Sequence, residues 1–314
     1  MKKFQKINSV LFLDKPFGFS SNAILQKVKK ILKVKKAGYI GTLDPIATGM
    51  LPICFGEATK FSNFFLVCKK TYIVSAILGV ETDTGDCTGR VIFNKEKKIK
   101  KEQIKKIVKF FLGKLDQIPP IYSAIKYKGI PLYKYARKNI PVKIRKKKIK
   151  IYSIKILKIK GKIVFLKICC SKGTYIRSII RDIGKKLGCG AHVSSLRRIS
   201  ISCYNKSHMI KFSRIKEYLK NEGKYFSNKN FSFLFSIEVL VKHLPKLYLS
   251  REEFNAIRIG KLITVKNKKI SFFTCYSLFL KKEKVFFGVG KLDGNQVLKI
   301  KRILSSQLLD KIME

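Results

Sequence analysis

The first part of the chain predicts a strand followed by a helix. An apolar run from Ser9 to Leu13 is typical of a buried strand, and turn-forming residues follow it up to Gly18. Ser20 or Ser21 then supplies an N-cap for a helix that ends near Lys33. The predicted core stripe of this helix consists of four apolar residues at helical spacing: Ile24, Val28, Ile31 and Leu32.

The middle of the chain continues this mixture of strands and helices. Lys70 to Gly79 predicts a strand, and an acidic turn follows it. Lys101 to Lys114 predicts an amphipathic helix with one apolar side, formed by Ile104, Ile107, Val108, Phe111 and Leu115. Two strands flank a turn at Gly161 and end near Cys170.

A second amphipathic helix is predicted after these strands. Thr174 is its expected cap, and Gly188 is expected to stop it. Residues 205 to 243 look helical and irregular, whereas short strands with glycine turns begin at about Leu244. We therefore expect an α+β chain with one domain over residues 1–243 and a small β domain over residues 244–314.

Composition supports a folded protein with an affinity for polyanions. Apolar residues make up 46% of the 314 residues, which is too many for a disordered basic tail. The chain has 69 Lys and Arg against 19 Asp and Glu, and a nucleic acid is the usual partner of such a surface. A genome-wide enrichment in lysine would produce part of the same excess, so charge alone supports nucleic-acid binding only weakly.

Neither metal chemistry nor a membrane anchor is indicated. The eight cysteines include no C-x-x-C pair, and the three histidines complete no zinc spacing. No apolar run approaches the roughly 20 residues that a membrane span needs. The N-terminus lacks the small-residue cleavage site of a signal peptide. We expect reduced thiols, no metal and a cytoplasmic location.

A loop around Asp44 carries the strongest chemical signal. This acidic residue lies in a Gly-, Thr- and Pro-rich stretch from Lys36 to Thr59, within a strongly basic chain. Basic neighbours would keep such a carboxylate ionised, which suits a nucleophile that works beside a polyanion. An Asp-Pro pair alone, however, is far more often a simple turn.

The segment from Pro119 to Ile144 has a character of its own. It contains four prolines and four tyrosines among many basic residues. Basic residues interleaved with aromatic ones fit a flexible arm that closes on RNA. They fit an ordinary ordered insertion equally well, and composition does not separate the two.

The loop and four other motifs closely resemble the bacterial TruB family of tRNA pseudouridine synthases. Gly41 to Gly49 matches the family signature G-[TA]-L-D-P-x-A-T-G, and the match continues without a gap to Phe61. The other matching motifs are Leu13 to Pro16 with Ser20 and Ser21, Lys70 to Tyr72, Ser171 to Arg177, and Gly188 to Arg198. The resemblance is strong over residues 9–204. The C-terminal part resembles the small RNA-binding PUA domain more weakly, through Ile257 to Ile263 and Val285 to Asp293.

The resemblance implies a role for each matching residue. Asp44 would be the nucleophile, and Arg177 would pair with it bidentately. Lys15 would support the catalytic loop from below. Tyr72 would stack on the target uridine, and Tyr175 and Leu196 would complete an apolar pocket for it. Without the motifs, each of these side chains would be read as an ordinary core residue or surface charge.

The resemblance also implies a fold and a reaction. The expected fold is a pseudouridine synthase domain around a mixed, mostly antiparallel sheet, with an RNA-gripping arm over residues 119–144 and a PUA-like domain over residues 244–314. The expected reaction converts the uridine at position 55, in the T loop of tRNA, to pseudouridine without a cofactor. The expected partner is the T arm of tRNA, and the enzyme would act as a monomer that needs no protein partner.

One residue departs from the family pattern. Most bacterial relatives carry His where this chain has Tyr39, two residues before Gly41. The family histidine is taken to contact RNA. A tyrosine can stack there but cannot accept a proton near neutral pH. We therefore expect Tyr39 to contact substrate and the reaction to be retained.

Three other functions compete with this interpretation. A relative that works with guide RNA and protein partners would share the catalytic motifs, but the arm over residues 119–144 argues against it. A non-catalytic RNA chaperone would not need Asp44, Tyr72 and Arg177 together. A generic basic protein that binds DNA or ribosomes leaves the signature from Gly41 to Gly49 unexplained.

Overall fold

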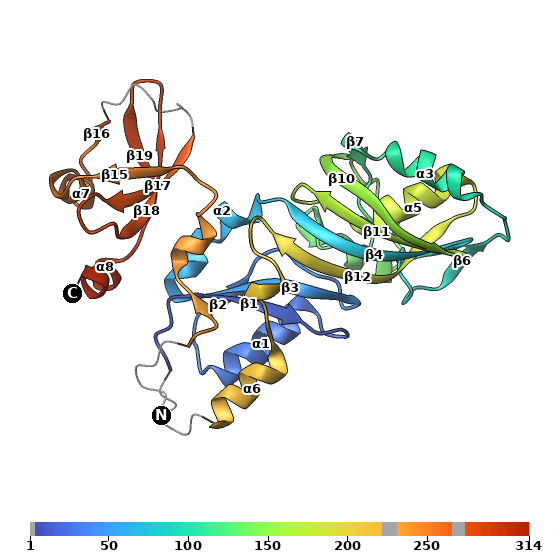
Figure 1. Cartoon of the computed structure of the whole chain (residues 1–314), viewed down its shortest axis with the longest axis horizontal. Coiled ribbons are helices and arrows are strands. Elements are labelled where there is room, and N and C mark those ends of the chain that lie inside the picture. Colours follow the sequence, from blue (N-terminus) through green and yellow to red (C-terminus); the bar gives the residue numbers. More distant parts are fainter. Residues whose placement is uncertain (1–3, 222–230, 266–273, 314) are drawn as a thin grey trace.

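The computed structural model describes residues 4–221, 231–265 and 274–313, which form a large sheet and a smaller C-terminal sheet (Figure 1). The large sheet has ten strands, and eight of them follow the order β13-β1-β3-β12-β4-β11-β10-β7, with β14 beside β1 and β2 beside β3. The bounds of these strands are β1 Val10–Lys15, β2 Ala37–Tyr39, β3 Ala47–Phe55, β4 Lys70–Leu78, β7 Gly113–Gln117, β10 Lys147–Lys160, β11 Ile163–Cys170, β12 Ala191–Ile201, β13 Ile210–Lys211 and β14 Leu234–Phe235.

The large sheet is mixed and mostly antiparallel, as the sequence predicts. Two of its pairings are parallel, β1 with β13 and β3 with β12. The β3–β12 pairing places Leu196 beside Ala47 and Arg198 beside Gly49. On its other side, β12 pairs antiparallel with β4, so that Arg198 lies opposite Tyr72. Three predicted motifs, far apart in the sequence, therefore become neighbours at the centre of the sheet.

Helices and short elements surround this sheet. Helices α1 and α6 lie together at one end of the molecule, whereas α3 and α5 lie near β7 and β10 (Figure 1). The helix bounds are α1 Ser21–Ile31, α2 Ser62–Leu66, α3 Lys101–Lys109, α4 Leu132–Arg137, α5 Ile176–Leu187 and α6 Phe212–Asn221. The 3₁₀ helices are η1 Gly56–Phe61, η2 Lys206–His208 and η3 Ile237–Leu240. Two hairpins are formed by β5 Val80–Thr82 with β6 Val91–Asn94, and by β8 Lys126–Tyr127 with β9 Ile130–Pro131.

The C-terminal part forms a separate five-stranded sheet, as expected for a small β domain. Its strands follow the order β15-β17-β18-β19-β16. Their bounds are β15 Lys246–Leu249, β16 Ile263–Thr264, β17 Cys275–Leu280, β18 Phe286–Leu292 and β19 Val297–Ile303, and the accompanying helices are α7 Arg251–Arg258 and α8 Ser306–Met313. This sheet contacts the rest of the chain at η1, where the rings of Phe61 and Phe286 lie 5.7 Å apart.

Two hydrophobic clusters hold these elements together. One cluster packs α1, α3 and α5 against the large sheet and includes Ile24, Val28 and Ile180. The other joins β1 and η1 to the C-terminal sheet and includes Phe12, Phe61 and Phe287. Removing this apolar surface from water supplies most of the stabilisation of such a fold.

Several sequence predictions are confirmed and two are wrong in detail. The Ser20 side chain caps α1, as predicted, and Gly188 ends α5 in a left-handed conformation. The predicted helix from Lys101 to Lys114 ends at Lys109, because Gly113 adopts a φ of +98° and begins strand β7, which pairs with β10. Thr174 does not cap α5: its hydroxyl donates to the Ser171 carbonyl, and Tyr175 is the N-cap residue.

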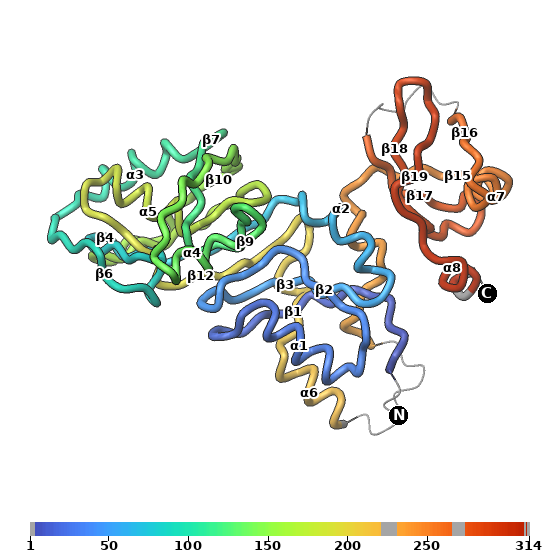
Figure 2. Tube along the Cα trace, turned by 180° about the vertical axis from the view of Figure 1, so that it is seen from behind, coloured from blue at the N-terminus to red at the C-terminus, as the bar shows by residue number. Residues whose placement is uncertain are grey.

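Two segments whose structure the sequence left open contain regular elements where the structure describes them. Residues 205–221 and 231–243 contain η2, α6 and η3, and residues 222–230 of the same predicted stretch lie outside the described residues. Residues 119–144 form the β8–β9 hairpin and α4 on the side of the molecule seen in Figure 2. The Tyr135 hydroxyl of α4 donates to the Tyr127 carbonyl of β8 and joins the helix to the hairpin. The insertion therefore has a local fold of its own.

Candidate active site

Asp44 lies in a loop, residues 42–49, that runs from the turn after β2 into the first three residues of β3. Gly41 and Gly49 bound this loop with φ values of +71° and +97°, which strongly favour glycine. A Cβ atom at Gly49 would collide with the backbone carbonyl of Arg198. The buried Ser21 hydroxyl accepts a 2.8 Å hydrogen bond from the Leu43 amide and donates a 2.9 Å bond to the Leu43 carbonyl. The loop is therefore fixed to α1 and to β12.

Arg177 forms an ion pair with Asp44. Its Nε atom lies 2.9 Å from Oδ2 of the carboxylate, and the Arg177 side chain is only 5% exposed. The contact is not bidentate as predicted, because Nη1 donates to the Thr84 carbonyl at 2.7 Å and Nη2 donates to the Tyr122 carbonyl at 3.0 Å. The guanidinium thus approaches Asp44 by one edge and is held by backbone on the other.

Opposing effects act on the Asp44 carboxyl group. Burial raises its pKa above the ordinary value, Arg177 counteracts this, and the nearby Asp86 carboxylate adds to it. Lys15 also lowers the Asp44 pKa. The sequence predicts a carboxylate that its basic neighbours keep ionised. In the structure burial outweighs these neighbours, and the pKa is raised.

Asp86 is a second acid beside the same arginine. It is 4% exposed, and its Oδ2 lies 3.6 Å from Nη1 of Arg177. Its Oδ1 accepts hydrogen bonds from the hydroxyls of Thr84 and Thr88 and from the Thr88 amide. Asp86 therefore orients Arg177 from the side away from Asp44.

Lys15 lies beneath the loop, as predicted. Its fully buried ammonium donates to the carbonyls of Pro16 and Phe19 at 2.9 and 2.6 Å, and it lies 3.4 Å from the Pro45 carbonyl. Burial lowers the pKa of Lys15 to about 8, although Asp44 acts in the opposite direction. The lysine thus connects the turn after β1 to the residue that follows Asp44.

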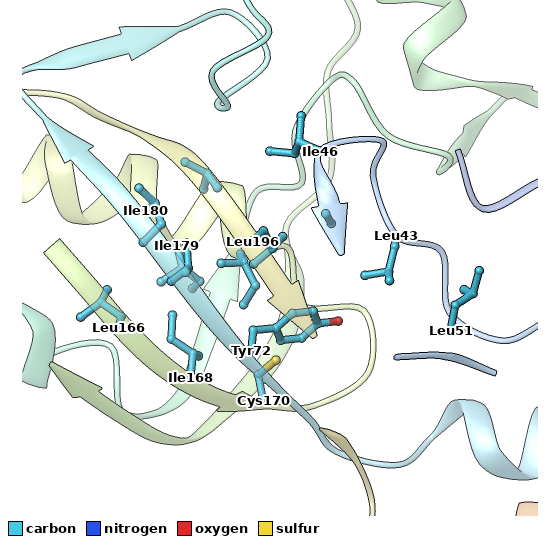
Figure 3. Packing of buried hydrophobic residues seen from close by; sticks show 14 of the residues in the cluster. Leu43, Ile46, Leu51, Tyr72, Leu166, Ile168, Cys170, Ile179, Ile180 and Leu196 are labelled. Atoms are coloured by element: carbon cyan, nitrogen blue, oxygen red, sulfur yellow. The ribbon is translucent and has the colours of Figure 1, made fainter. Parts of the chain in front are cut away.

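Tyr72 and Leu196 lie on adjacent strands near the loop. They are 7% and 6% exposed and belong to the cluster that contains Leu43 and Ile46 of the loop (Figure 3). Burial raises the pKa of the Tyr72 hydroxyl, and Arg198 counteracts this effect. These contacts bring Tyr72, Leu196 and the Asp44 loop together.

Tyr175 lies at the start of α5, two residues before Arg177. Burial raises the pKa of its hydroxyl, the nearby Ser123 lowers it, and Asp44 raises it further. The side-chain amide of the buried Gln117 donates to the Tyr175 carbonyl at 3.0 Å and accepts from the Tyr175 amide at 2.8 Å. The last residue of β7 therefore fixes the backbone that presents Tyr175.

Tyr39 lies apart from these six residues. It is half-buried in β2, opposite Ile53 of β3, and packs against the first hydrophobic cluster. Within the described parts of the chain, no hydrogen bond or ion pair joins Tyr39 to the other predicted site residues. The structure thus brings six of the seven predicted residues around the loop, and Tyr39 lies on the strand that leads into it.

Sequence reasoning missed three buried polar residues at the site: Asp86, Gln117 and Arg198. Each of them contacts a predicted site residue or the Asp44 loop. Gln117 and Arg198 do so across 58 and 148 residues of sequence. Asp86 was seen only as part of an acidic turn, and Arg198 only as the end of a motif. Local sequence patterns gave no signal that these three side chains are buried.

Two other kinds of feature are not found among the described residues. In the part of the chain that the structure describes, no three His, Cys, Asp or Glu side chains gather as a metal-binding set. Over the same residues, no helix is both long and apolar enough to cross a bilayer.

Comparisons with known proteins give matches over most of the chain. Residues 29–176 match the TruB family pseudouridylate synthase N-terminal domain, and residues 177–241 match the tRNA pseudouridylate synthase B C-terminal domain. The chain is 44% identical over 306 residues to tRNA pseudouridine synthase B of Buchnera aphidicola from Schizaphis graminum, covering 96% of this chain and 97% of that protein. It is 47% identical to the protein of the same name from Wigglesworthia glossinidia brevipalpis, covering 91% of this chain and 86% of that one.

Solved structures resemble the fold as a whole. A chain of a Cbf5-Nop10-Gar1 complex superposes with a TM-score of 0.73 and 24% identity, covering 94% of this chain and 84% of that one. A chain of an H/ACA RNP bound to a substrate RNA containing 2'-deoxyuridine gives the same TM-score and identity, over 95% and 86% of the two chains. This similarity concerns the fold alone.

Proposed function

The chain belongs to the TruB family of tRNA pseudouridine synthases, and we propose that it isomerises the uridine at position 55 of tRNA, with Asp44 as nucleophile. The enzyme class follows from the family, whereas the position and the mechanism are our proposal. One observation carries it. The signature aspartate lies in a rigid glycine-bounded loop and pairs at 2.9 Å with the buried Arg177.

The proposed reaction is an internal rearrangement. The glycosidic bond from the base nitrogen N1 to the ribose breaks, the base turns, and a bond from uracil C5 to the same ribose carbon forms. The C5 proton leaves to solvent and N1 takes up a proton, so no electrons are gained or lost, and apart from this proton exchange every atom belongs to the substrate. Asp44 would act by attacking the ribose, attacking the base or removing a sugar proton, and each of these roles requires its ionised form.

Arg177 and Asp86 would tune Asp44 for this role. A guanidinium beside a carboxylate favours the ionised form, and Arg177 counteracts the effect of burial on Asp44. Because Arg177 is also anchored by two backbone carbonyls and by Asp86, it can hold Asp44 in one orientation. Lys15 would support the loop from the opposite side.

The target uridine would have to leave the RNA stack before it reaches Asp44. Extrusion of a base costs a few kcal/mol, and stacking on an aromatic ring recovers about 1–3 kcal/mol. We assign this stacking to Tyr72, with Leu196 and Tyr175 forming the rest of an apolar pocket. Tyr72 and Leu196 share one hydrophobic cluster with Leu43 and Ile46 of the Asp44 loop, and this proximity supports the assignment.

Residues 119–144 are proposed to grip the T arm. Their hairpin and α4 expose several basic residues, and Arg137 lies over the Tyr133 ring at 5.5 Å. The root of this arm contacts the site, because Arg177 donates to Tyr122 and Ser178 donates to Ile118. We place the start of a PUA-like RNA-binding domain at residue 244. We further propose that the enzyme acts as a monomer and needs no cofactor or protein partner.

The test is release of tritium from a tRNA transcript labelled at uridine C5. The purified chain alone should release about one equivalent per tRNA, and changing the uridine at position 55 to cytidine should abolish release from that site. Release that persists after this change would place the reaction at another uridine. Release only after addition of another RNA or protein would favour the guide-dependent alternative.

A further inference from the structure

Arg198 is a buried cation at the centre of the large sheet. Its side chain is 1% exposed and is the largest fully buried side chain among the described residues. No carboxylate within the described ranges forms an ion pair with it at 4.0 Å or less. Burying a charge in this way costs free energy unless its donors are satisfied, so its three contacts are informative.

Two of these contacts lie at opposite ends of the Asp44 loop. Nη2 donates to the Gly41 carbonyl at 2.8 Å, just before the loop residues 42–49. Nε donates to the Met50 carbonyl at 2.7 Å, just after them. Since the guanidinium is planar and rigid, these two bonds hold both ends of the loop at a set separation.

The third contact reaches the stacking tyrosine. Nη1 lies 3.5 Å from the Tyr72 hydroxyl. Arg198 also counteracts the effect of burial on the pKa of that hydroxyl. One side chain therefore touches both ends of the loop that carries Asp44 and the residue assigned to stack on the base.

We propose that Arg198 is a positioning residue, which holds the Asp44 loop and the Tyr72 ring in register for the reaction. This inference rests on the proposed function, because it assigns Arg198 a role through Asp44 and Tyr72. Arg198 touches neither the Asp44 carboxylate nor the reacting atoms in our assignment. It acts through the backbone that presents them.

The backbone of Arg198 has a separate structural role. Its peptide pairs with Gly49 in β3 and with Tyr72 in β4, and these pairings do not need the guanidinium. A substitution of the side chain therefore leaves the strand pairing in place. Lysine keeps the charge and much of the aliphatic chain, but its single ammonium cannot bond Gly41 and Met50 in the same fork geometry.

Lys70 provides a matched control. It is also a buried cation, 5% exposed, and it also donates only to backbone carbonyls among the bonds described, those of Leu66 and Cys68. Both of these carbonyls lie outside the Asp44 loop. Lys70→Met removes a buried charge and its carbonyl bonds while keeping an unbranched side chain of similar length.

The first measurement compares single-turnover tritium release and tRNA binding for wild type, Arg198→Lys, Arg198→Met and Lys70→Met. We expect the two Arg198 variants to lose about tenfold or more in rate, which corresponds to about 1.4 kcal/mol of barrier, with tRNA Kd within about twofold. Lys70→Met should keep its rate within about twofold under conditions where all four proteins are folded. Full rates in the Arg198 variants, or an equal loss in Lys70→Met, would overturn the proposal.

The second measurement does not depend on activity. Hydrogen exchange of the full chain should accelerate at residues 42–49 in Arg198→Lys and stay unchanged in β11. Unchanged exchange at 42–49, or faster exchange across the whole sheet, would overturn the proposal that Arg198 holds the Asp44 loop. Asp44→Asn, run in parallel, separates the two hypotheses: if that variant turns over normally, the assignment of the nucleophile fails, while the exchange result still decides whether Arg198 holds the loop.

Discussion

The Nε atom of Arg177 lies 2.9 Å from Oδ2 of Asp44. This contact joins helix α5 to the loop that leads from β2 into β3. The remaining nitrogens of this guanidinium are bound to the carbonyls of Thr84 and Tyr122. The arginine thus links the catalytic loop, the turn after β5 and the root of the arm. Three consequences for stability and activity follow from these contacts, and two more follow from a buried lysine and a buried glutamine.

Replacement of Arg177 by lysine should separate charge from geometry. Lysine keeps the positive charge but cannot reach Asp44 and the two carbonyls together. We expect single-turnover tritium release to fall about a hundredfold or more and the unfolding free energy to fall by about 1–3 kcal/mol, the usual cost of leaving buried hydrogen-bonding groups without a partner. Urea unfolding and single-turnover kinetics would measure both. A variant with the wild-type rate would remove Arg177 from the mechanism.

Asp86→Asn should shift the pH dependence of the reaction. The Asp86 carboxylate raises the pKa of Asp44, so its neutralisation should lower that pKa. Since the ionised form of Asp44 is the active one, the acid limb of the rate profile should move to lower pH. A profile of single-turnover rate from pH 5 to pH 8 measures the shift. Movement of the acid limb to higher pH would contradict the assignment.

The same substitution should also weaken the fold. Asp86 accepts three hydrogen bonds in a buried turn and contacts Arg177. We expect Asp86→Asn to lower the unfolding free energy by about 1–3 kcal/mol, because bonds to a charged group become bonds to a neutral amide. Thr88→Val removes one of these donors and serves as the milder control.

Lys70 should make stability depend on pH in the alkaline range. Burial lowers its pKa in the folded chain to about 8, from 10.5 for the free side chain. Between these values the unfolded chain binds the additional proton, so the unfolding free energy should rise with pH. Compared with Lys70→Met, wild type should therefore gain stability from pH 8 to pH 10. Urea unfolding at intervals over this range tests the sign, and a relative loss by wild type would show that it is wrong.

Gln117→Leu should loosen the start of α5. Both polar atoms of the Gln117 amide are bonded to the backbone of Tyr175, two residues before Arg177. Leucine leaves these two backbone groups without their partner, and we expect a loss of about 1–3 kcal/mol in the unfolding free energy. Gln103→Leu, on the exposed side of α3, is the matched control. Equal stability of Gln117→Leu and wild type would contradict the role of this amide.

The sequence predicted those features that local patterns encode. The glycine-bounded loop around Asp44, the Ser20 cap of α1 and the Gly188 stop of α5 depend on residues close together in the chain, and the structure confirms them. The family resemblance then identified the seven site residues from short motifs. Their roles stay predictions.

The features that the sequence did not predict depend on distant partners. Apolar spacing extended α3 to Lys114, but β7 pairs with β10, whose residues lie 30 or more positions further along, and this pairing makes Gly113–Gln117 a strand. The prediction that Arg177 pairs bidentately with Asp44 was wrong, because its two Nη atoms donate to carbonyls of two other segments. Arg198 reaches carbonyls 148 and 157 residues away, which no local pattern reveals.

The measurement that tests the central claim most directly compares Asp44→Asn with wild type on C5-tritiated tRNA. The substitution removes the charge and nucleophilicity of the carboxylate and nearly preserves its shape. We expect wild type to release tritium and Asp44→Asn to release none, with tRNA affinity within about tenfold of wild type, or about 1.4 kcal/mol. Full turnover by a folded Asp44→Asn protein would contradict the account.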